Sequence, residues 1–453
     1  MTRGYRIIRV KQIAALVLVF ACVATLRKLG SRALLWYGWG NEYTDTVLNF
    51  YTALSQKMSV VHSPRWKELM LDAAHINISQ AERMMLHLSP TLHSYKWADL
   101  DLTNFPEFEF LPNFKNPCWR ESYIPPVTCP IAPNYKRNMT SIPRSKMSLR
   151  CLPYFLIIGQ PKCGTTDIYR RLNMHPEVTL PGPKESFWME RIRFRPNCSS
   201  INTYLDYQQR SANSIDRVFR KGAAGEVYHH VITGDGSVDV MWDNTFWPML
   251  PGNEGCREPC VTNADMVHHL NPRASIIISL RNPIDRLYSD YLYEAQWLHY
   301  GISKLDFHQE VEQEIREFNA CLLTNSVRGC AYTGSHENAY SSKVRLRQGL
   351  YSVHVSDWLR VFPRQQLHII KFEEYMLDIE NHMKSLFRFL DLRELTKSEM
   401  TPILELKRSN TRKAAAQRVG EMLAETRQLL TYFYGRYNKE LANILSDTKY
   451  LWD

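Results

Sequence analysis

The sequence predicts an α/β protein with a central, mostly parallel β-sheet and helices on both of its faces. From Cys151 onward, short β-rich runs alternate with helical stretches, as expected of parallel strands joined by crossover helices. One run, residues 276–280, is apolar at nearly every position, which is typical of a central strand buried on both faces. With 453 residues, 44% of them hydrophobic and 23% charged, the chain can form one large domain with accessory segments.

The alternation predicts the order of the elements. Residues 31–150 lack clear periodicity and are rich in proline toward their end, so we expect a stem there, followed by the α/β domain over residues 151–453. The expected strands are residues 154–159, 238–241, 274–280 and 366–372, and the expected helices are residues 164–174, 283–297, 305–320, 349–361, 380–390 and 415–434.

The N-terminus carries an apolar run at residues 13–26, with basic residues before it and Arg27 and Lys28 after it. This pattern predicts a cytoplasmic tail at residues 1–11 and a transmembrane signal anchor at residues 12–30. A cleaved signal peptide is the alternative, because the charged start and the small residues around Ala21 fit that reading too. Either reading sends the rest of the chain into the secretory pathway.

Three N-glycosylation sequons, at Asn77, Asn138 and Asn197, agree with a lumenal location. Nine of the ten cysteines lie beyond the apolar run, where an oxidising lumen permits disulfides. We expect one disulfide between Cys321 and Cys330 and another between Cys118 and Cys151; none of the cysteines shows the spacing of a zinc site.

The net charge of +10 indicates an anionic partner. Nucleic acid, an acidic membrane surface and an acidic polysaccharide all fit this charge, and the charge alone does not choose among them.

The turn after the first expected strand is the first candidate binding site. Residues 159–166 read GQPKCGTT and lead into a helix, so backbone N–H groups and a helix N-terminus point at one place, which favours an anion. Gly164 allows close backbone approach, while Lys162, Thr165 and Thr166 supply a charge and two hydroxyls. The lysine precedes the glycine, unlike in the loop of ATP- and GTP-binding enzymes, and this order disfavours a nucleoside kinase. An ordinary strand–helix turn with a surface lysine is the alternative.

A second turn of the same kind follows residues 274–280. Arg281 leaves the end of the strand, Pro283 suits the first turn of a helix, and Ser289 lies about two turns further on. An arginine and a serine hydroxyl can converge on a second phosphate. The alternative role for Arg281 is a salt bridge with Asp285.

Both turns resemble motifs of the Golgi carbohydrate sulfotransferases. IIGQPKCGTT is similar to their 5′-phosphosulfate loop and ISLRNPIDRLYSDYLY to their 3′-phosphate motif, and the resemblance extends over residues 151–453. It implies a P-loop-like sulfotransferase fold and 3′-phosphoadenosine-5′-phosphosulfate (PAPS) as the sulfate donor, with no metal required. It also implies residue roles: Lys162 at the leaving group; Cys163, Gly164, Thr165 and Thr166 at the 5′-phosphate; Arg281 and Ser289 at the 3′-phosphate; and Thr411, Arg412 and Lys413 in a basic loop that closes over the nucleotide.

The resemblance also assigns a general base. Glu185, in the segment PKESFW, matches the family position of this carboxylate. Relatives often carry His two residues later, where this chain has Phe187, so Glu185 is the sole candidate base in that motif. Pairing of Glu185 with Lys184 on a surface loop is the alternative. Trp188 and Trp242 are candidates for stacking on sugar rings, although tryptophan is more often packed inside.

The resemblance therefore implies a type II Golgi membrane enzyme that sulfates a glycosaminoglycan and binds no nucleic acid. Within the family, similarity to the members that sulfate N-acetylgalactosamine 4-sulfate favours the 6-hydroxyl of that sugar in chondroitin or dermatan sulfate. Heparan sulfate or another glycan is an alternative acceptor. A non-catalytic glycosaminoglycan-binding relative is the alternative of a different class, which the loss of the histidine at position 187 leaves open.

Overall fold

The computed structural model describes residues 109–122, 129, 147–182, 184–194, 198–298, 300–332, 342–408 and 414–452. The expected tail and membrane anchor, most of the expected stem, and the sequons at Asn77, Asn138 and Asn197 lie outside these residues. Within the part that is described, no helix is both long and apolar enough to cross a membrane.

A four-stranded sheet lies at the centre, in the order β6-β3-β7-β8, and each neighbouring pair is parallel. The parallel sheet expected from the sequence is therefore confirmed. Its strands are β3 (Phe155–Gly159), β6 (Gly234–Asp235), β7 (Ser275–Leu280) and β8 (Leu367–Lys371).

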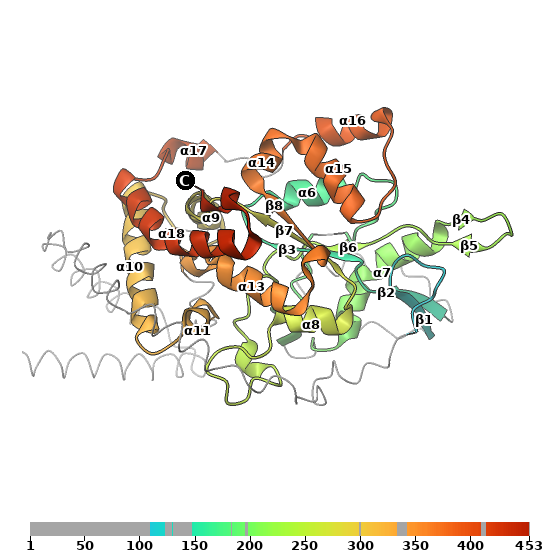
Figure 1. Cartoon of the computed structure of the whole chain (residues 1–453), viewed down its shortest axis with the longest axis horizontal. Helices are drawn as coiled ribbons and strands as arrows, with labels where there is room; N and C mark the ends of the chain where they lie inside the picture. The colour runs from blue at the N-terminus through green and yellow to red at the C-terminus, as the bar shows by residue number, and fades with distance from the viewer. Residues whose placement is uncertain are drawn as a thin grey trace, which may run out of the picture. The chain divides into compact units, whose positions relative to one another are not determined.

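Alternate residues of β3 enter two different hydrophobic cores. Phe155 and Ile157 belong to one core, while Leu156 and Ile158 belong to the other, and all four are buried. The period of two along a strand explains this division, and burial on both faces explains why the strand is continuously apolar. The first core includes α6 (Thr165–Leu172), α14 (Phe372–Leu377), α15 (Ile379–Phe389) and α16 (Lys397–Glu405), and the second includes α8 (Asn263–Leu270) and α13 (Tyr351–Val361), on opposite sides of the sheet (Figure 1).

The remaining elements surround this centre. Helix α18 (Ala424–Leu445) packs along α13, and α9 (Pro283–Leu298) contacts α18. The helices are α7 (Ile201–Arg217), α9 (Pro283–Leu298), α10 (Lys304–Leu322), α11 (Val327–Tyr332), α17 (Ala414–Val419) and α18 (Ala424–Leu445); the 3₁₀ turns are Ile192–Phe194, Trp247–Met249, Leu346–Gly349, Arg364–Gln366 and Thr448–Leu451; and the short strands are β1 (Cys118–Ser122), β2 (Met147–Cys151), β4 (Arg220–Lys221) and β5 (Val227–Tyr228).

The strand expected at residues 238–241 is wrong, because the chain makes a turn there. Asp235, at the end of β6, causes it: its Oδ1 accepts hydrogen bonds from the backbone N–H of Ser237 at 2.8 Å and from the Ser237 hydroxyl at 2.7 Å. The apolar side chains of Val238 and Met241 are buried in the core from a turn instead of a strand. Burial, not strand structure, explains the apolar run.

The helix expected at residues 415–434 is wrong in its bounds. It is two helices, α17 and α18, separated at Gly420, which has a φ of 74°. Such a left-handed conformation ends a helix and suits glycine. The second helix then runs well beyond the expected end, to Leu445.

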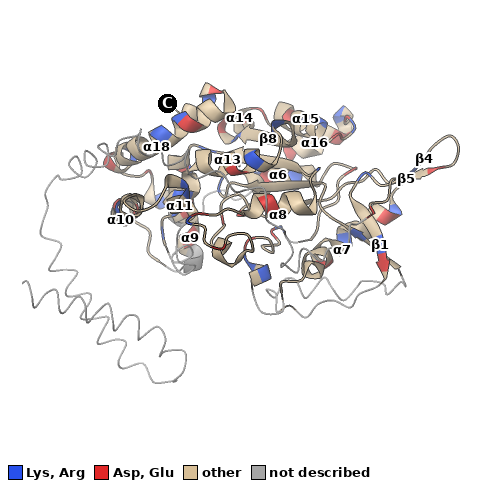
Figure 2. Cartoon of the chain, turned by 60° about the horizontal axis from the view of Figure 1, so that its bottom comes forward, with Lys and Arg blue, Asp and Glu red and all other residues tan. Residues whose placement is uncertain are grey.

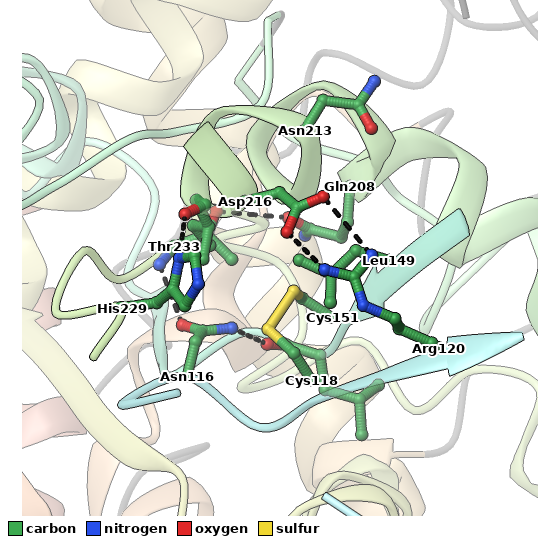
Figure 3. The surroundings of a disulfide bond; sticks show 12 residues. Asn116, Cys118, Arg120, Leu149, Cys151, Gln208, Asn213, Asp216, His229 and Thr233 are labelled. Carbon is green, nitrogen blue, oxygen red and sulfur yellow. Dashed lines mark hydrogen bonds and ion pairs between the residues drawn. A yellow bond between two sulfur atoms is a disulfide. The ribbon is translucent and has the colours of Figure 1, made fainter. Parts of the chain in front are cut away.

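Both expected disulfides are confirmed. Cys321 is bonded to Cys330, and Cys118 is bonded to Cys151 across the antiparallel pair of β1 and β2. Asn116, close to the Cys118–Cys151 bond, connects this ribbon to the rest of the domain. Its amide donates to the carbonyl of Leu152 at 2.7 Å, and it accepts a hydrogen bond from the N–H of Thr233 at 2.9 Å (Figure 3). Two further disulfides, Cys129–Cys198 and Cys256–Cys260, were not anticipated as pairs.

Candidate active site

The turns that follow β3 and β7 open into one cleft of about 550 Å³. Because both strands are parallel neighbours, their carboxyl ends meet at the same edge of the sheet, where ligands bind in open α/β sheets. Seven of the predicted site residues line the cleft: Lys162, Gly164, Thr165, Thr166, Glu185, Arg281 and Ser289.

The turn after β3 is held against β7 by two hydrogen bonds. The N–H of Gln160 donates to the carbonyl of Ser279 at 2.8 Å, and the Ser279 hydroxyl donates to the carbonyl of Cys163 at 2.7 Å. Gly164 has a φ of 77°, and a Cβ there would lie 2.7 Å from the ring of Phe372, so only glycine fits. The thiol of Cys163 is fully buried, which raises its pKa to about 12 and leaves it a poor nucleophile.

Lys162 projects into the cleft from a left-handed backbone, with a φ of 67°. Its Nζ lies 3.2 Å from the centroid of the Tyr293 ring, a cation–π contact with α9. Burial lowers the pKa of the Lys162 ammonium to about 8, although the charges of Asp290 and Glu294 act in the opposite direction. Neither carboxylate lies within 4.0 Å of it, and no other residue in the described part of the chain forms a salt bridge with it. The ammonium is therefore available to an anionic ligand.

The turn after β7 brings Arg281 beside that loop. Its Nη1 donates to the carbonyl of Lys162 at 3.4 Å, and its guanidinium lies 5.2 Å from the centroid of the Phe372 ring. The alternative pairing with Asp285 is absent, since Asp285 instead pairs with Arg427 at 2.9 Å. Among the described residues Arg281 has no salt-bridge partner, so its charge also remains available.

Glu185 reaches the cleft from a loop that is anchored in the core. The neighbouring residue, Ser186, donates from its hydroxyl to Asp235 at 3.0 Å and from its N–H to the Ser237 hydroxyl at 2.9 Å. Glu185 itself has a φ of 75° and is 27% exposed, and its carboxylate pairs with the Lys184 ammonium at 2.5 Å. Glu185 therefore lies in the cleft and also forms the ion pair with Lys184 that the sequence left as an alternative. A left-handed conformation outside glycine is a strained one, and such strain is typical of functional loops.

Two further arginines line the cleft: Arg191, from a basic segment that the sequence suggests as either a contact for a sulfated chain or a solvated surface, and Arg345, which no sequence motif indicated. Arg191 pairs with Asp239 and, at 2.9 Å, with Asp243, while Arg345 pairs with Glu294 at 3.0 Å and with Asp290 at 3.4 Å. Their partners lie far away in the sequence, so no local motif marks them.

The two tryptophans singled out in the sequence have different fates. Trp242 is half-buried and lines the cleft, where its indole N–H donates to Asp239 at 3.0 Å. Trp188 is 1% exposed and stacks on Tyr204, so it is packed in the core and does not reach a sugar.

The predicted closing loop, with Thr411, Arg412 and Lys413, lies outside the described residues. The chain leading to it is fixed to α6 by Arg171, which pairs with Asp167 at 2.6 Å and donates to the carbonyl of Leu406 at 2.8 Å. Arg408, just beyond, is exposed and lines the cleft. Arg408 is a basic residue shortly before the loop of Thr411, Arg412 and Lys413, which the resemblance assigns to the nucleotide.

Figure 2 shows Lys and Arg interspersed with Asp and Glu over the described helices. The pairing of individual cations therefore says more about anion binding than the net charge does. The cleft combines unpaired cations at the ends of two adjacent strands with a carboxylate on a facing loop, which suits transfer of a group from a doubly phosphorylated nucleotide to a hydroxyl. The described residues contain no cluster of three or more His, Cys, Asp or Glu arranged to hold a metal ion.

Comparisons of the sequence with known proteins show the family. The family model described as "Sulfotransferase domain" matches residues 152–429. Carbohydrate sulfotransferase 15 of Mus musculus is 32% identical over 443 residues, which cover 91% of this chain and 77% of the relative. The bifunctional heparan sulfate N-deacetylase/N-sulfotransferase 2 of Homo sapiens is 27% identical over 373 residues, covering 77% of this chain and 35% of that protein. A sulfotransferase structure from Alicyclobacillus acidocaldarius aligns with a TM-score of 0.42 and 22% identity, over 65% of this chain and 96% of that one.

Proposed function

Because this chain belongs to the sulfotransferase family, whose enzymes use PAPS, we propose that it sulfates a glycosaminoglycan at the 6-hydroxyl of N-acetylgalactosamine 4-sulfate in chondroitin or dermatan sulfate. One observation carries the proposal: Lys162 and Arg281, both without salt-bridge partners in the described residues, share a cleft with Glu185. The acceptor assignment rests on the similarity to carbohydrate sulfotransferase 15.

Donor binding follows from the two turns. Thr165, Thr166 and the backbone N–H of Gly164 hold the 5′-phosphate at the N-terminus of α6, where a helix favours negative charge. The N–H of Cys163 instead donates to the carbonyl of Gln160 at 3.2 Å and fixes the shape of the turn. Arg281 and Ser289 hold the 3′-phosphate, and the segment from Arg408 through Thr411, Arg412 and Lys413 covers the nucleotide.

Transfer requires a base on the acceptor and positive charge on the leaving group. Glu185 takes the proton of the acceptor hydroxyl as the oxygen attacks sulfur, and the sulfur–oxygen bond to the nucleotide phosphate breaks. Lys162 stabilises the negative charge that builds up on this departing phosphate. Lys184, whose ammonium pairs with the Glu185 carboxylate at 2.5 Å, holds that carboxylate in the cleft.

The test is transfer from radiolabelled PAPS by the purified chain to chondroitin, dermatan and heparan sulfates and their partly desulfated forms. Labelled disaccharides from chondroitin sulfate with 4,6-disulfated N-acetylgalactosamine are the expected product. Label on heparan sulfate alone would favour the second acceptor, which the similarity to the heparan sulfate enzyme supports. Binding of the chains without any label would favour a non-catalytic relative.

We also propose that the protein is a type II Golgi membrane protein with its catalytic domain in the lumen. The apolar run at residues 13–26 and four disulfides among the described residues support this location. Glycosidase treatment of the protein from secretory cells should lower its apparent mass, and replacing Asn77, Asn138 and Asn197 with Gln should abolish that shift.

A further inference from the structure

A second recess opens beside the cleft and has no role in the chemistry described above. Its volume is about 100 Å³, and it shares three lining residues with the cleft: Trp242, Arg345 and Gln348. A molecule bound in the cleft can therefore extend into the recess.

The shared wall is rigid. Gln348 accepts a hydrogen bond from the buried Arg286 at 2.8 Å, and Arg345 is held by Glu294 and Asp290 on α9. Groups that are fixed before a ligand arrives bind it without a further ordering cost.

Arg347 is the unpaired cation of the recess. Its guanidinium lies 6.0 Å from the centroid of the Phe318 ring, and its buried Nε has no hydrogen-bond partner. No carboxylate of the described residues lies within salt-bridge distance of it. A partly buried cation without a salt-bridge partner favours an anionic ligand.

The remaining lining defines what kind of ligand fits. Two carboxylates, Glu314 and Glu317, line the recess, and Glu314 accepts a hydrogen bond from the Ser342 hydroxyl at 2.7 Å. Both carboxylates can accept hydrogen bonds from the hydroxyls of a sugar. The indole of Trp242 adds a flat surface of the kind that sugar rings pack against. The recess thus suits a ring with one anionic group and several hydroxyls.

We propose that the recess is a second acceptor subsite that binds a hexuronic acid next to the sugar that receives sulfate. Arg347 holds its single carboxylate, Glu314 and Glu317 accept its hydroxyls, and Trp242 contacts the ring. This rests on the proposed function, because chondroitin and dermatan sulfates alternate N-acetylgalactosamine with a hexuronic acid.

The experiment compares chondroitin sulfate with the same polymer after chemical reduction of its carboxyl groups. The KM of the unmodified protein should be about tenfold higher for the reduced polymer, since a charged hydrogen bond is lost. Arg347→Gln should raise the KM for native chondroitin sulfate to the same level and abolish the difference between the polymers. The KM for PAPS should stay unchanged. Arg316→Gln is the matched control, because Arg316 is exposed on the same helix as Glu314 and Glu317 and does not line the recess.

Three results would overturn the subsite. The first is that the Arg347→Gln variant still has different KM values for the two polymers. The second is that this variant has a raised KM for PAPS, which would place the nucleotide in the recess. The third is that the unmodified protein has the same KM for both polymers. Binding of 3′-phosphoadenosine 5′-phosphate (PAP) by each variant checks its folding, and Glu317→Gln, at an exposed position, gives an independent test. It should raise the KM for both polymers by the same few-fold factor, and an unchanged KM would count against hydroxyl recognition. If the unmodified protein binds PAP but labels no chain, the proposed function fails, whereas equal kinetics of Arg347→Gln and unmodified protein contradict the subsite alone.

Discussion

The cations of the cleft fall into two groups. Lys162 and Arg281, on the turns after β3 and β7, have no salt-bridge partner among the described residues, whereas Arg191 and Arg345, which also line the cleft, each pair with two carboxylates. The charge of a paired arginine is neutralised by the neighbouring carboxylates, and the ion pairs hold the lining of the cleft in place. An unpaired and partly buried cation leaves a desolvated charge to be satisfied by a ligand. The difference supports the proposal that the phosphates bind at the two turns, without reference to any relative.

The largest effect is expected at the carboxylate that faces the unpaired cations. Glu185→Gln removes the base and should lower kcat by about 10²–10⁴-fold, while the affinity for PAP stays within about twofold of the unmodified protein. Steady-state transfer and calorimetric PAP binding measure the two quantities. Glu226→Gln, at an exposed glutamate outside the cleft, is the control. Undiminished turnover by Glu185→Gln would remove the assignment of the base.

Lys162→Met should lower kcat by about 10²–10³-fold, because it removes the charge that stabilises the leaving phosphate. Lys162→Arg, which keeps a charge of different shape, should recover part of this loss. Single-turnover transfer separates the chemical step from product release. If Lys162→Met had the kcat of the unmodified protein, the lysine would hold only the nucleotide.

Arg281→Gln should weaken PAP binding by about 10–100-fold, since a charged hydrogen bond to a phosphate is lost. Arg427→Gln is a matched control, because Arg427 forms an exposed ion pair with Asp285. Loss of this pair should change the affinity for PAP by about twofold at most. Equal losses in the two variants would mean that general charge, and not a defined phosphate site, attracts the nucleotide.

The affinity for PAP should also depend on pH through Lys162. Burial lowers its pKa to about 8, so the side chain loses its proton, and with it the attraction for phosphate, as the pH rises above that value. We expect PAP affinity to fall by about tenfold per pH unit above pH 8, up to the higher pKa of the complex. Lys162→Arg should have a flat profile in this range, and a sloping profile in that variant would assign the titration to another group.

The smallest effect on donor binding is expected at a paired cation. Arg191→Gln removes the ion pairs with Asp239 and Asp243 and should lower the free energy of unfolding by about 1–3 kcal/mol. PAP affinity should change by less than about twofold if the two groups of cations differ as described. Denaturant unfolding and calorimetry would test this, and a loss of PAP affinity equal to that of Arg281→Gln would erase the distinction.

The sequence predicted well what depends on neighbouring residues. The strands β3, β7 and β8 follow from short apolar runs, and the glycine and prolines that end or start elements mark both candidate anion-binding turns. The expected strand at residues 238–241 failed for a local reason too, because hydrogen bonds to Asp235 turn the chain before an apolar run can extend.

The rest of the site depends on residues that are distant in the chain. Arg191 meets Asp239 and Asp243, and Arg345 meets Glu294, only because the fold brings separate segments together. The same is true of the recess, whose lining comes from residues near 242, 314 and 345.

By itself, therefore, the sequence determined the parallel α/β class, the two turns that carry Lys162 and Arg281, and the resemblance that selects Glu185. Local periodicity and the chemistry of short motifs are enough for these. The tertiary structure decided which charges are neutralised and which remain free, that Trp242 lines the cleft while Trp188 is buried, and that a recess with an unpaired Arg347 adjoins the cleft. These properties depend on burial and on contacts between distant segments, which no local pattern encodes.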